Sequence, residues 1–386
     1  MIPSTDSSAL FYDPAASGWY RFHNEFATIE VGADSLASVR TAFGEVEALV
    51  EKRGLFAFGF ISYQAAPAFD AAMKVPGASS FPLLSFKLFK SAQLVPHLDA
   101  DELKSLFPHE DGRPAGPVTA PVLWETITES EYARGFAAIK RSLAEGDTYQ
   151  VNYTCRFSSG DENGISGKCG RLFGRPEGYY ARYSAGDVDV ISFSPELFFR
   201  KTGRVLLSMP MKGTAPRYAD PGKDRESRGW LAGSEKNRAE NLMIVDMVRN
   251  DMGRIARPGT VRVENLFGLE TYGYVHQMVS SVYAETDAPV SGVMDALFPC
   301  ASITGAPKIK TMEIISRLEA SSRDVYTGAV GMLFPGGNGV FSVAIRTLWR
   351  QKDNRCWRYG AGGGVVWDSD VRDEWRELHM KTGVVV

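Results

Sequence analysis

The grouping of strand-like segments along the chain is the feature that most constrains its fold. Segments that alternate apolar and polar residues, or that are rich in β-branched and aromatic residues, come in runs, as at 188–193, 197–200 and 205–209. Single helix-like segments separate these runs, and strands and helices do not alternate regularly. A doubly wound parallel sheet is therefore disfavoured, and the pattern predicts an α+β fold with antiparallel sheets.

The clearest alternation runs from residue 149 to residue 157. Apolar side chains occupy the odd positions, whereas Gln150, Asn152, Thr154 and Arg156 occupy the even ones. Successive side chains of a strand point to opposite faces, so these four polar groups share one face. Such a face is more often solvated than functional, but it can also form the floor of a site.

Two helix starts are marked by capping residues. Thr128 and Glu131 have the spacing of a capping box. Ser234 precedes a segment with helical periodicity that runs to Gly253, and we predict that Ser234 is its N-cap. Further helices are expected at 35–51, 293–297, 307–320 and 370–382.

The segment 108–121 is rich in proline, glycine and charge, as is typical of a surface loop between two parts of a fold. We therefore predict an N-terminal subdomain over residues 1–115 and a second region over residues 120–386. A chain of 386 residues is long enough to bury a large core.

Charge and hydropathy exclude several classes of function. A formal net charge of -3 argues against nucleic acid as a main partner, because phosphate binding needs a basic surface. The apolar runs are too short or too interrupted to span a bilayer, and the first residues lack the features of a signal peptide. The four cysteines have no metal-binding spacing. These observations predict a cytoplasmic enzyme without a membrane partner.

Carboxylates on two predicted helices are candidate metal ligands. Glu240 shares a helix face with apolar side chains, so it needs either an ion-pair partner such as Lys236 or a metal ion. Glu374, Glu377 and Lys381 line one side of the last helix, an arrangement that taken alone is usually a solvated salt-bridge face. Together with Glu240, these carboxylates form a candidate site for a hard cation.

Several basic or glycine-rich positions could hold an anion. Lys212 is a lone amine between Pro210 and Gly213, although it could equally be a surface lysine. Arg346 lies in an apolar segment that is predicted as a strand, where a guanidinium favours a bidentate acid. His276 lies in another, and such a histidine is more often structural. Two glycine-containing turns, 302–308 and 360–364, could present backbone N–H groups, although the second could equally be a plain hairpin turn. These features suggest a small substrate with two carboxylates.

Seven ordered motifs resemble those of the chorismate-binding enzymes, which include anthranilate synthase, aminodeoxychorismate synthase, and the isochorismate and salicylate synthases. The resemblance implies their fold, in which two antiparallel β-sheets pack face to face with helices outside and the site lies between the sheets. The motifs are YQVNYT at 149–154, SPELF at 194–198, KGTAPR at 212–217, AENLMIVD at 239–246, TGAPK at 304–308, AIRT at 344–347 and GAGGG at 360–364.

The resemblance also implies a ligand set. Glu240 and Glu377 would coordinate Mg²⁺, which would hold the ring carboxylate of chorismate, with Glu374 in support. Family members often carry a fourth glutamate where this chain has Asn237. His276 would lie near the departing C4 hydroxyl. The residues implied to bind substrate are Thr214, Thr304, Gly305, Tyr326, Arg346, Gly362, Gly363 and Lys381.

Two positions indicate the reaction. The water-using synthases carry a lysine base where this chain has Gln150, so ammonia is the expected nucleophile. Lys212 resembles the lysine-bearing loop of aminodeoxychorismate synthase component I. The resemblance implies that Lys212 attacks C2 while Glu196 protonates the leaving C4 hydroxyl, after which ammonia adds at C4. The product would be 4-amino-4-deoxychorismate, a precursor of 4-aminobenzoate and folate.

Two other functions stay open, and a partner is expected. Anthranilate synthase component I would use the same site with direct attack of ammonia at C2, and a chorismate-binding regulator would not turn the substrate over. The sequence contains no glutamine-hydrolysing cysteine motif. Unless free ammonia is the donor, a separate glutamine amidotransferase subunit is therefore expected, forming a heterodimer. A tryptophan pocket in the N-terminal region can be neither assigned nor excluded.

Overall fold

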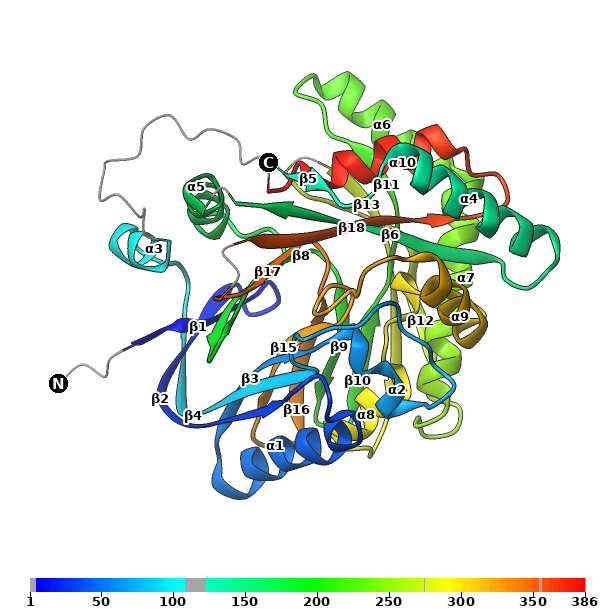
Figure 1. The fold of residues 1–386 in the computed structure, drawn as a ribbon. Coiled ribbons are helices and arrows are strands. Elements are labelled where there is room, and N and C mark those ends of the chain that lie inside the picture. Colours follow the sequence, from blue (N-terminus) through cyan, green and yellow to red (C-terminus); the bar gives the residue numbers. More distant parts are fainter. Residues whose placement is uncertain (1–4, 108–122, 161, 274, 354–355, 386) are drawn as a thin grey trace.

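A computed structural model describes residues 5–107, 123–160, 162–273, 275–353 and 356–385. All strand pairs within these ranges are antiparallel, and they connect eighteen strands in one hydrogen-bonded network. Helices lie around the strands (Figure 1). The predicted α+β class with antiparallel sheets is confirmed.

The network is a long path of strands, and its first half runs from β6 to β1. Strand β6 pairs with β18, which pairs with β17, and the path continues through β8 and β7 to β1. The short strands β5 and β14 also pair with β6. The bounds of these strands are β1 Thr5–Asp13, β5 Trp124–Glu125, β6 Gln150–Ser159, β7 Tyr179–Ala185, β8 Val188–Ser194, β14 Gly305–Ala306, β17 Thr347–Gln351 and β18 Trp357–Val365.

The second half of the path continues from β1. Strand β2 pairs with β1 and β4, and the path runs through β3, β15, β16, β9 and β10 to β13. Strands β11 and β12 flank β13. The bounds are β2 Gly18–Val31, β3 Phe56–Ile61, β4 Leu84–Val95, β9 Leu197–Thr202, β10 Val205–Met209, β11 Met211–Pro216, β12 Arg262–Thr271, β13 Val275–Glu285, β15 Ala329–Phe334 and β16 Asn338–Val343.

Helices cover the outer faces of both halves. Side chains of α4, α5, α9 and α10 pack with β6 and β18 in one core cluster, and those of α1, α7 and α8 pack with the second half in another. The bounds are α1 Val39–Arg53, α2 Ala66–Phe69, α3 Ala100–Leu106, α4 Glu129–Ala144, α5 Glu162–Phe173, α6 Pro221–Gly233, α7 Glu235–Gly253, α8 Val290–Leu297, α9 Lys308–Leu318, α10 Val371–Thr382, and the 3₁₀ turns η1 Leu36–Ser38, η2 Tyr63–Ala65 and η3 Ala301–Ile303.

A third, largely aromatic core cluster joins the two halves. It contains Phe11 and Tyr183 from the first half and Phe22, Phe58 and Phe60 from the second. The rings of Phe22 and Phe58 stack with their centroids 5.2 Å apart. Burial of such large rings stabilises the packing of one half on the other. Strands from residues 1–115 therefore share both pairing and core with strands from residues 120–386.

The local helix signals are confirmed, whereas one predicted strand is broken. Thr128 and Glu131 form the capping box of α4, and the Ser234 hydroxyl accepts a hydrogen bond from the Asn237 N–H at the start of α7. The segment 340–348 is divided into β16 and β17, and Arg346 lies between them with a φ of +51°. The prediction of Arg346 within a continuous strand is therefore wrong.

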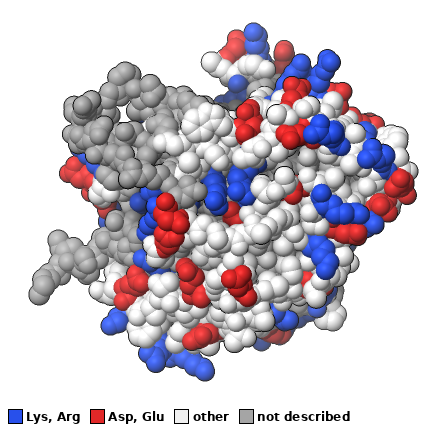
Figure 2. Space-filling model, viewed as in Figure 1, with Lys and Arg blue, Asp and Glu red and all other residues white. Residues whose placement is uncertain are grey.

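The surface and the helices agree with the exclusions drawn from composition. Acidic and basic side chains are interspersed over the face shown in Figure 2, and the absence of a nucleic-acid partner stays a prediction. Within the described ranges, no helix is both long and apolar enough to cross a bilayer. The cytoplasmic location stays a prediction.

Candidate active site

The two ends of the strand path meet where Lys212 of β11 approaches β18. A Cβ atom built on Gly364 would lie 3.3 Å from Lys212 Nζ and 2.9 Å from Gln150 Nε2. The glycine at 364 thus leaves the space that these two side-chain ends occupy. Strands from the two halves, β11 on one side and β6 with β18 on the other, bring these residues together (Figure 1).

A bulge in β11 sets the position of Lys212. The register of β11 against β13 shifts between Met211 and Thr214, and Gly213 has a φ of +87°. A Cβ on Gly213 would lie 2.9 Å from the Asn237 Cβ of α7. Bulges redirect the side chains around them, and glycine allows the close approach of the helix. The predicted constraint of Lys212 by Gly213 is therefore visible in the backbone.

Lys212 lies among the acidic residues that were predicted to accompany it. Burial lowers the pKa of the Lys212 amine below its usual value. The carboxylates of Glu240, Glu196 and Glu377 oppose this decrease in pKa. The charge of Lys381 adds to the decrease. The structure thus places Lys212 within electrostatic reach of all four residues. A lysine with a lowered pKa has a larger fraction of neutral, nucleophilic amine.

Glu196 is buried in the connection between β8 and β9. Burial raises the pKa of its carboxyl to about 7, while the polar groups of Ser302 and the Met211 backbone, and the charges of Lys212 and Arg346, oppose that rise. Its Oε1 atom has no hydrogen-bond partner among the residues that the structure describes. A carboxyl that titrates near neutrality can both donate and accept a proton.

The three predicted metal ligands have different environments. Burial raises the pKa of Glu240 and that of Glu374, whose Oε1 accepts a 2.7 Å hydrogen bond from Ser369 Oγ. Glu377 is about half exposed, and Lys381 Nζ lies 2.7 Å from its Oε1 and lowers its pKa. The salt bridge that was the alternative to a metal site on α10 is thus formed between Glu377 and Lys381. Over the described ranges, neither Glu240 nor Glu374 has a cationic partner within 4.0 Å.

These carboxylates suit a hard cation by their chemistry. Buried carboxylates that lack a cationic partner favour a compensating charge, and oxygen donors are those that Mg²⁺ prefers. Glu374 Oε2 lies 2.6 Å from the place where a Cβ on Gly363 would stand. It therefore faces the glycine strand, residues 360–364 of β18, which were predicted as a turn but lie within the strand. No group of three or more acidic, histidine or cysteine side chains in the described ranges is already gathered to hold a metal ion. The donor set fits Mg²⁺, but it is not assembled around one point.

Two predicted substrate-binding residues lie in the turn before α9. Thr304 is buried, and its hydroxyl bonds to the carbonyl oxygens of Cys300 and Ala301. Gly305 has a φ of +143° and pairs with Val151 of β6. The short strand β14 thus fastens this turn to the strand that carries Gln150.

Arg346 and Tyr326 approach β17 and β18 from two different turns. The Arg346 carbonyl accepts a hydrogen bond from the Phe193 N–H, and the charge of Arg346 acts on Glu196. Tyr326 is buried, and its ring is parallel to that of Trp349, with centroids 6.3 Å apart. Glycine at 360 makes room for the Tyr326 ring. Both residues therefore belong to the region of β18.

The two remaining predicted substrate-binding residues, Lys381 and Thr214, lie on different elements. Lys381 Nζ donates a 2.7 Å hydrogen bond to the Gly362 carbonyl, next to Gly363. Thr214 is exposed on β11, and its hydroxyl lies 3.3 Å from Gln277 Nε2. Lys381 thus contacts the glycine strand. Thr214 lies on β11, two residues after Lys212.

His276 has both ring nitrogens occupied. Its Nδ1 lies 3.0 Å from the Thr271 hydroxyl and its Nε2 lies 3.1 Å from Asp224 Oδ1. Asp224 also accepts a hydrogen bond from Arg217 Nε. These contacts tie His276 to β12 and α6. The position of His276 near the departing C4 hydroxyl of a bound substrate stays a prediction.

The sequence did not indicate roles for the side chains of Ser302 and Asp224, and it did not indicate that Gln150 is buried. Gln150 is fully buried, and in the described chain neither atom of its side-chain amide has a hydrogen-bond partner. The polar face of β6 is thus a buried floor and not a solvated surface. The alternation at 149–157 was the signal for Gln150, whereas Asp224 and Ser302 meet their partners only in the fold.

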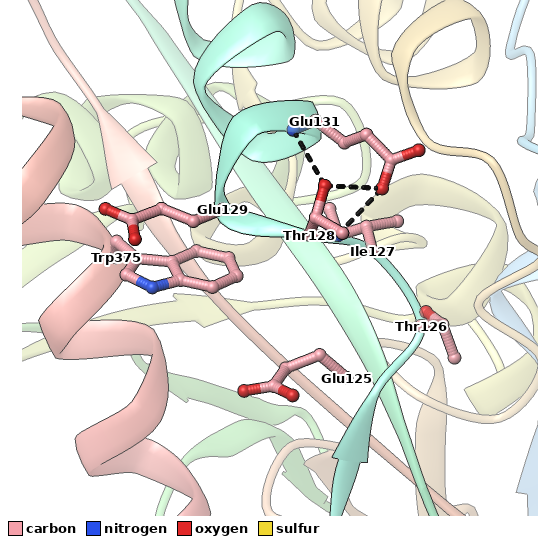
Figure 3. Close-up of a pocket in the computed structure, with 7 residues that line it drawn as sticks. All are labelled: Glu125, Thr126, Ile127, Thr128, Glu129, Glu131 and Trp375. Carbon is pink, nitrogen blue, oxygen red and sulfur yellow. Dashed lines mark hydrogen bonds between the residues drawn. The ribbon is translucent and has the colours of Figure 1, made fainter.

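Two cavities lie outside this region. One of about 310 Å³ lies between the loop before α4 and Trp375 of α10, and Figure 3 shows Glu125 and Glu129 on its walls. Glu131 is engaged there with Thr128. A second, of about 180 Å³, lies between that loop and the end of α9. Neither is lined by a predicted site residue.

Comparison with known proteins agrees with the motifs. The family model for chorismate binding enzymes matches residues 6–386. Aminodeoxychorismate synthase component 1 of Klebsiella aerogenes is 40% identical over 280 residues, 70% of this chain and 61% of that protein. Anthranilate synthase component 1 of Streptomyces coelicolor is 36% identical over 272 residues, 66% of this chain and 50% of that protein. The matched part thus spans less than two thirds of either relative.

The fold has a close counterpart among solved structures. The crystal structure of anthranilate synthase component I from Streptococcus pneumoniae superposes with a TM-score of 0.80, covering 100% of this chain and 93% of that chain, at 22% sequence identity. At this identity the likeness establishes the architecture alone. It agrees with the antiparallel strand network and outer helices described above.

Proposed function

We propose, from the premise that this chain belongs to the chorismate binding enzymes, that it acts as an aminodeoxychorismate synthase component 1. The reaction would convert chorismate and ammonia into 4-amino-4-deoxychorismate and water. The observation that carries the proposal is the position of Lys212, whose amine reaches Gly364 in the other half of the strand network and lies within electrostatic reach of Glu196, Glu240 and Glu377. The relatives named aminodeoxychorismate synthase component 1 support it.

Burial acts on the pKa values of Lys212 and Glu196 in opposite directions. Burial favours the neutral amine of Lys212, and burial favours the protonated acid of Glu196. In the first step, the Lys212 nitrogen bonds to C2 of the ring while the C4–oxygen bond breaks, and the Glu196 proton leaves with that oxygen as water. The proton that the attached nitrogen carries can then return to Glu196.

Ammonia completes the cycle. It bonds to C4 while the bond between C2 and the Lys212 nitrogen breaks, and one ammonia proton is taken up by the departing lysine. Gln150 has amide rather than basic chemistry, so it cannot activate water by removing a proton at neutral pH. The presence of Gln150 therefore favours addition of ammonia over addition of water.

The carboxylates and basic residues would hold the two acid groups of chorismate. Glu240, Glu377 and Glu374 would bind Mg²⁺, which when bound draws negative charge away from the ring carboxylate. Arg346 and the glycine strand at 362–363 would hold the enolpyruvyl carboxylate, with Tyr326 beside them. When no cation neutralises the charges of Glu240 and Glu377, these two carboxylates favour the ammonium form of Lys212.

The name component 1 of the relatives supports a second subunit. We propose that a glutamine amidotransferase supplies ammonia to this chain in a cytoplasmic heterodimer. The test is to compare glutamine and ammonium salts as donors with the isolated chain. Turnover with ammonium but not with glutamine is expected, and turnover of glutamine by this chain alone would contradict the need for a partner.

Anthranilate synthase component 1 is the second candidate, because relatives of that name are also similar. The two functions differ in the carbon that receives ammonia. Purified protein with chorismate, Mg²⁺ and ammonium should yield 4-aminobenzoate only after an aminodeoxychorismate lyase is added. Fluorescent anthranilate without the lyase would reject the proposed function, and binding of chorismate without any product would indicate a regulator.

A further inference from the structure

Neighbouring residues of β13 point to opposite sides of the strand. His276 Nε2 lies 3.1 Å from Asp224 Oδ1 of α6, and Ser280 Oγ donates a 2.6 Å hydrogen bond to Asn241 Oδ1 of α7. The face of β13 that carries these two residues is therefore covered by the outer helices. Successive side chains of a strand alternate between its faces, so Gln277 points away from α6 and α7.

Gln277 lies in the middle of a polar row that crosses three strands. On one side it pairs with Thr214 of β11, and Gln277 Nε2 donates a 3.3 Å hydrogen bond to the Thr214 hydroxyl. Thr214 is exposed and stands two residues after Lys212. On the other side Gln277 pairs with Glu270 of β12, which accepts a 2.7 Å hydrogen bond from the Tyr272 hydroxyl. The row thus begins beside the proposed nucleophile.

The hairpin of β12 and β13 reaches the other half of the strand network. Where β12 leads into β13, the Gly273 N–H donates a 3.0 Å hydrogen bond to Glu177 Oε2, in the connection between α5 and β7. Burial raises the pKa of the Tyr272 hydroxyl, and the charge of Arg346 opposes that rise. Tyr272 and Gln277 share a face, so that face lies toward Arg346, one of the residues proposed to hold the substrate.

The carboxamide oxygen of Gln277 has no donor to accept from. Its Oε1 atom is buried, and the described part of the chain provides no hydrogen-bond partner for it, while Nε2 is engaged with Thr214. A buried acceptor without a donor is costly, so Oε1 is expected to accept from a bound molecule. His276 differs, because Thr271 and Asp224 already occupy its two ring nitrogens.

Chorismate carries a single hydrogen-bond donor. Its two carboxylates and its ether oxygen can only accept, and its C4 hydroxyl alone has a polar hydrogen. We propose that Gln277, in place of His276, binds the substrate by accepting the hydrogen bond of that hydroxyl, and so orients the C4–oxygen bond that breaks. This inference rests on the proposed function, because it takes chorismate as the ligand. The carboxamide transfers no proton, and the proton that leaves with the oxygen still comes from Glu196.

The test compares the binding of chorismate with that of its 4-deoxy analogue, which lacks the hydroxyl. Calorimetry is carried out with Mg²⁺ and without ammonia, in proteins that all carry Lys212→Ala, so that no covalent step contributes. With glutamine at position 277, chorismate should bind about fivefold to tenfold more tightly than the analogue. Gln277→Met has a similar length but no carboxamide oxygen, and it should bind the two ligands equally.

Three further variants make the result specific to Gln277. Gln277→Glu keeps an acceptor oxygen and should prefer chorismate at least as strongly as glutamine does, because any repulsion of the ligand carboxylates acts on both ligands alike. Ser281→Ala is the matched control, since Ser281 is buried on the same face of β13, and its preference should not change. His276→Asn should also retain the preference.

The ratio of the two affinities separates this inference from the proposed function. It is measured without turnover, so it does not depend on which carbon receives ammonia. Formation of anthranilate would reject the proposed function and leave the expected ratio as it is. An unchanged preference for chorismate in Gln277→Met, or a preference that is lost in His276→Asn instead, would overturn the role of Gln277 whichever product the enzyme makes.

Discussion

Lys212 Nζ lies 3.3 Å from the point where a side chain on Gly364 would begin. Lys212 belongs to β11 of one half of the strand network, and Gly364 belongs to β18 of the other. The amine therefore bridges the two halves of the strand network, and it does so at a place where any residue larger than glycine would compete for the same space.

Gly364→Ala should reduce turnover by at least about tenfold while lowering the free energy of unfolding by only about 1 kcal/mol. The new methyl would meet the ends of the Lys212 and Gln150 side chains, which can move aside without a shift of the backbone. Steady-state kinetics and urea denaturation would measure the two effects. Gly360→Ala is the control, because its methyl would meet the buried Tyr326 ring and should mainly cost stability. Full activity in Gly364→Ala would show that Lys212 need not occupy its observed place.

Lys212→Ala should slow amination at C4 by a factor of at least about a thousand, because the nucleophile of the first step is missing. Chorismate binding, measured by calorimetry with Mg²⁺ present, should be largely intact because other residues hold the two carboxylates. Mass spectrometry of the wild-type protein during turnover should detect the adduct on Lys212. Product formation at the wild-type rate in the variant would eliminate the covalent role.

The stability of the protein should fall as pH rises toward and through about 7, in part because of Glu196. Burial raises the folded-state pKa of this carboxyl to about 7, above its usual value of 4.5. Its stabilising contribution is therefore complete below the unfolded-state pKa and is lost as pH rises through the folded-state value, with an upper limit of about 3 kcal/mol. Urea denaturation of the free protein between pH 5 and about 8 measures this. Glu196→Gln should flatten that part of the curve, and an unchanged slope would contradict the assignment.

Glu240→Gln should weaken Mg²⁺ binding by at least about tenfold, because it removes a charged oxygen donor from the proposed set. Calorimetric titration of Mg²⁺ in the presence of chorismate reads this without turnover, and chelation of the metal should abolish activity in the wild type. Asp373→Asn provides the control, since Asp373 is an exposed acid on α10 that pairs with Arg376. Equal Mg²⁺ affinity in Glu240→Gln and in the wild type would remove Glu240 from the ligand set.

Local signals in the sequence were sufficient for several features. The capping box of Thr128 and Glu131 and the N-cap at Ser234 are interactions among residues three apart, so the sequence order already contains both partners. The helical spacing of Glu374, Glu377 and Lys381 likewise predicted that they share one side of α10, and Lys381 does contact Glu377. The motif order indicated the family, and the family model matches nearly the whole chain.

Other features depended on contacts between distant parts of the chain. Arg346 reads as part of a strand, but tertiary packing interrupts that strand and holds Arg346 at a φ of +51°. Gln150 was predicted on a polar strand face, yet only the packing of β14 and the approach of Lys212 show that this face is buried. The contact of Asp224 with His276 has no signal in either segment.

The sequence by itself determined the class of fold, the helix starts, the chemical groups of the site and the family. Periodicity, caps and motifs depend on neighbours within a few residues, and those neighbours are written in the order of the chain. The tertiary structure alone decided which polar groups are buried, which way Gln277 and His276 are held, and how near Lys212 comes to Gly364. Burial and close approach depend on residues that are far apart in the chain, and their partners are chosen by packing.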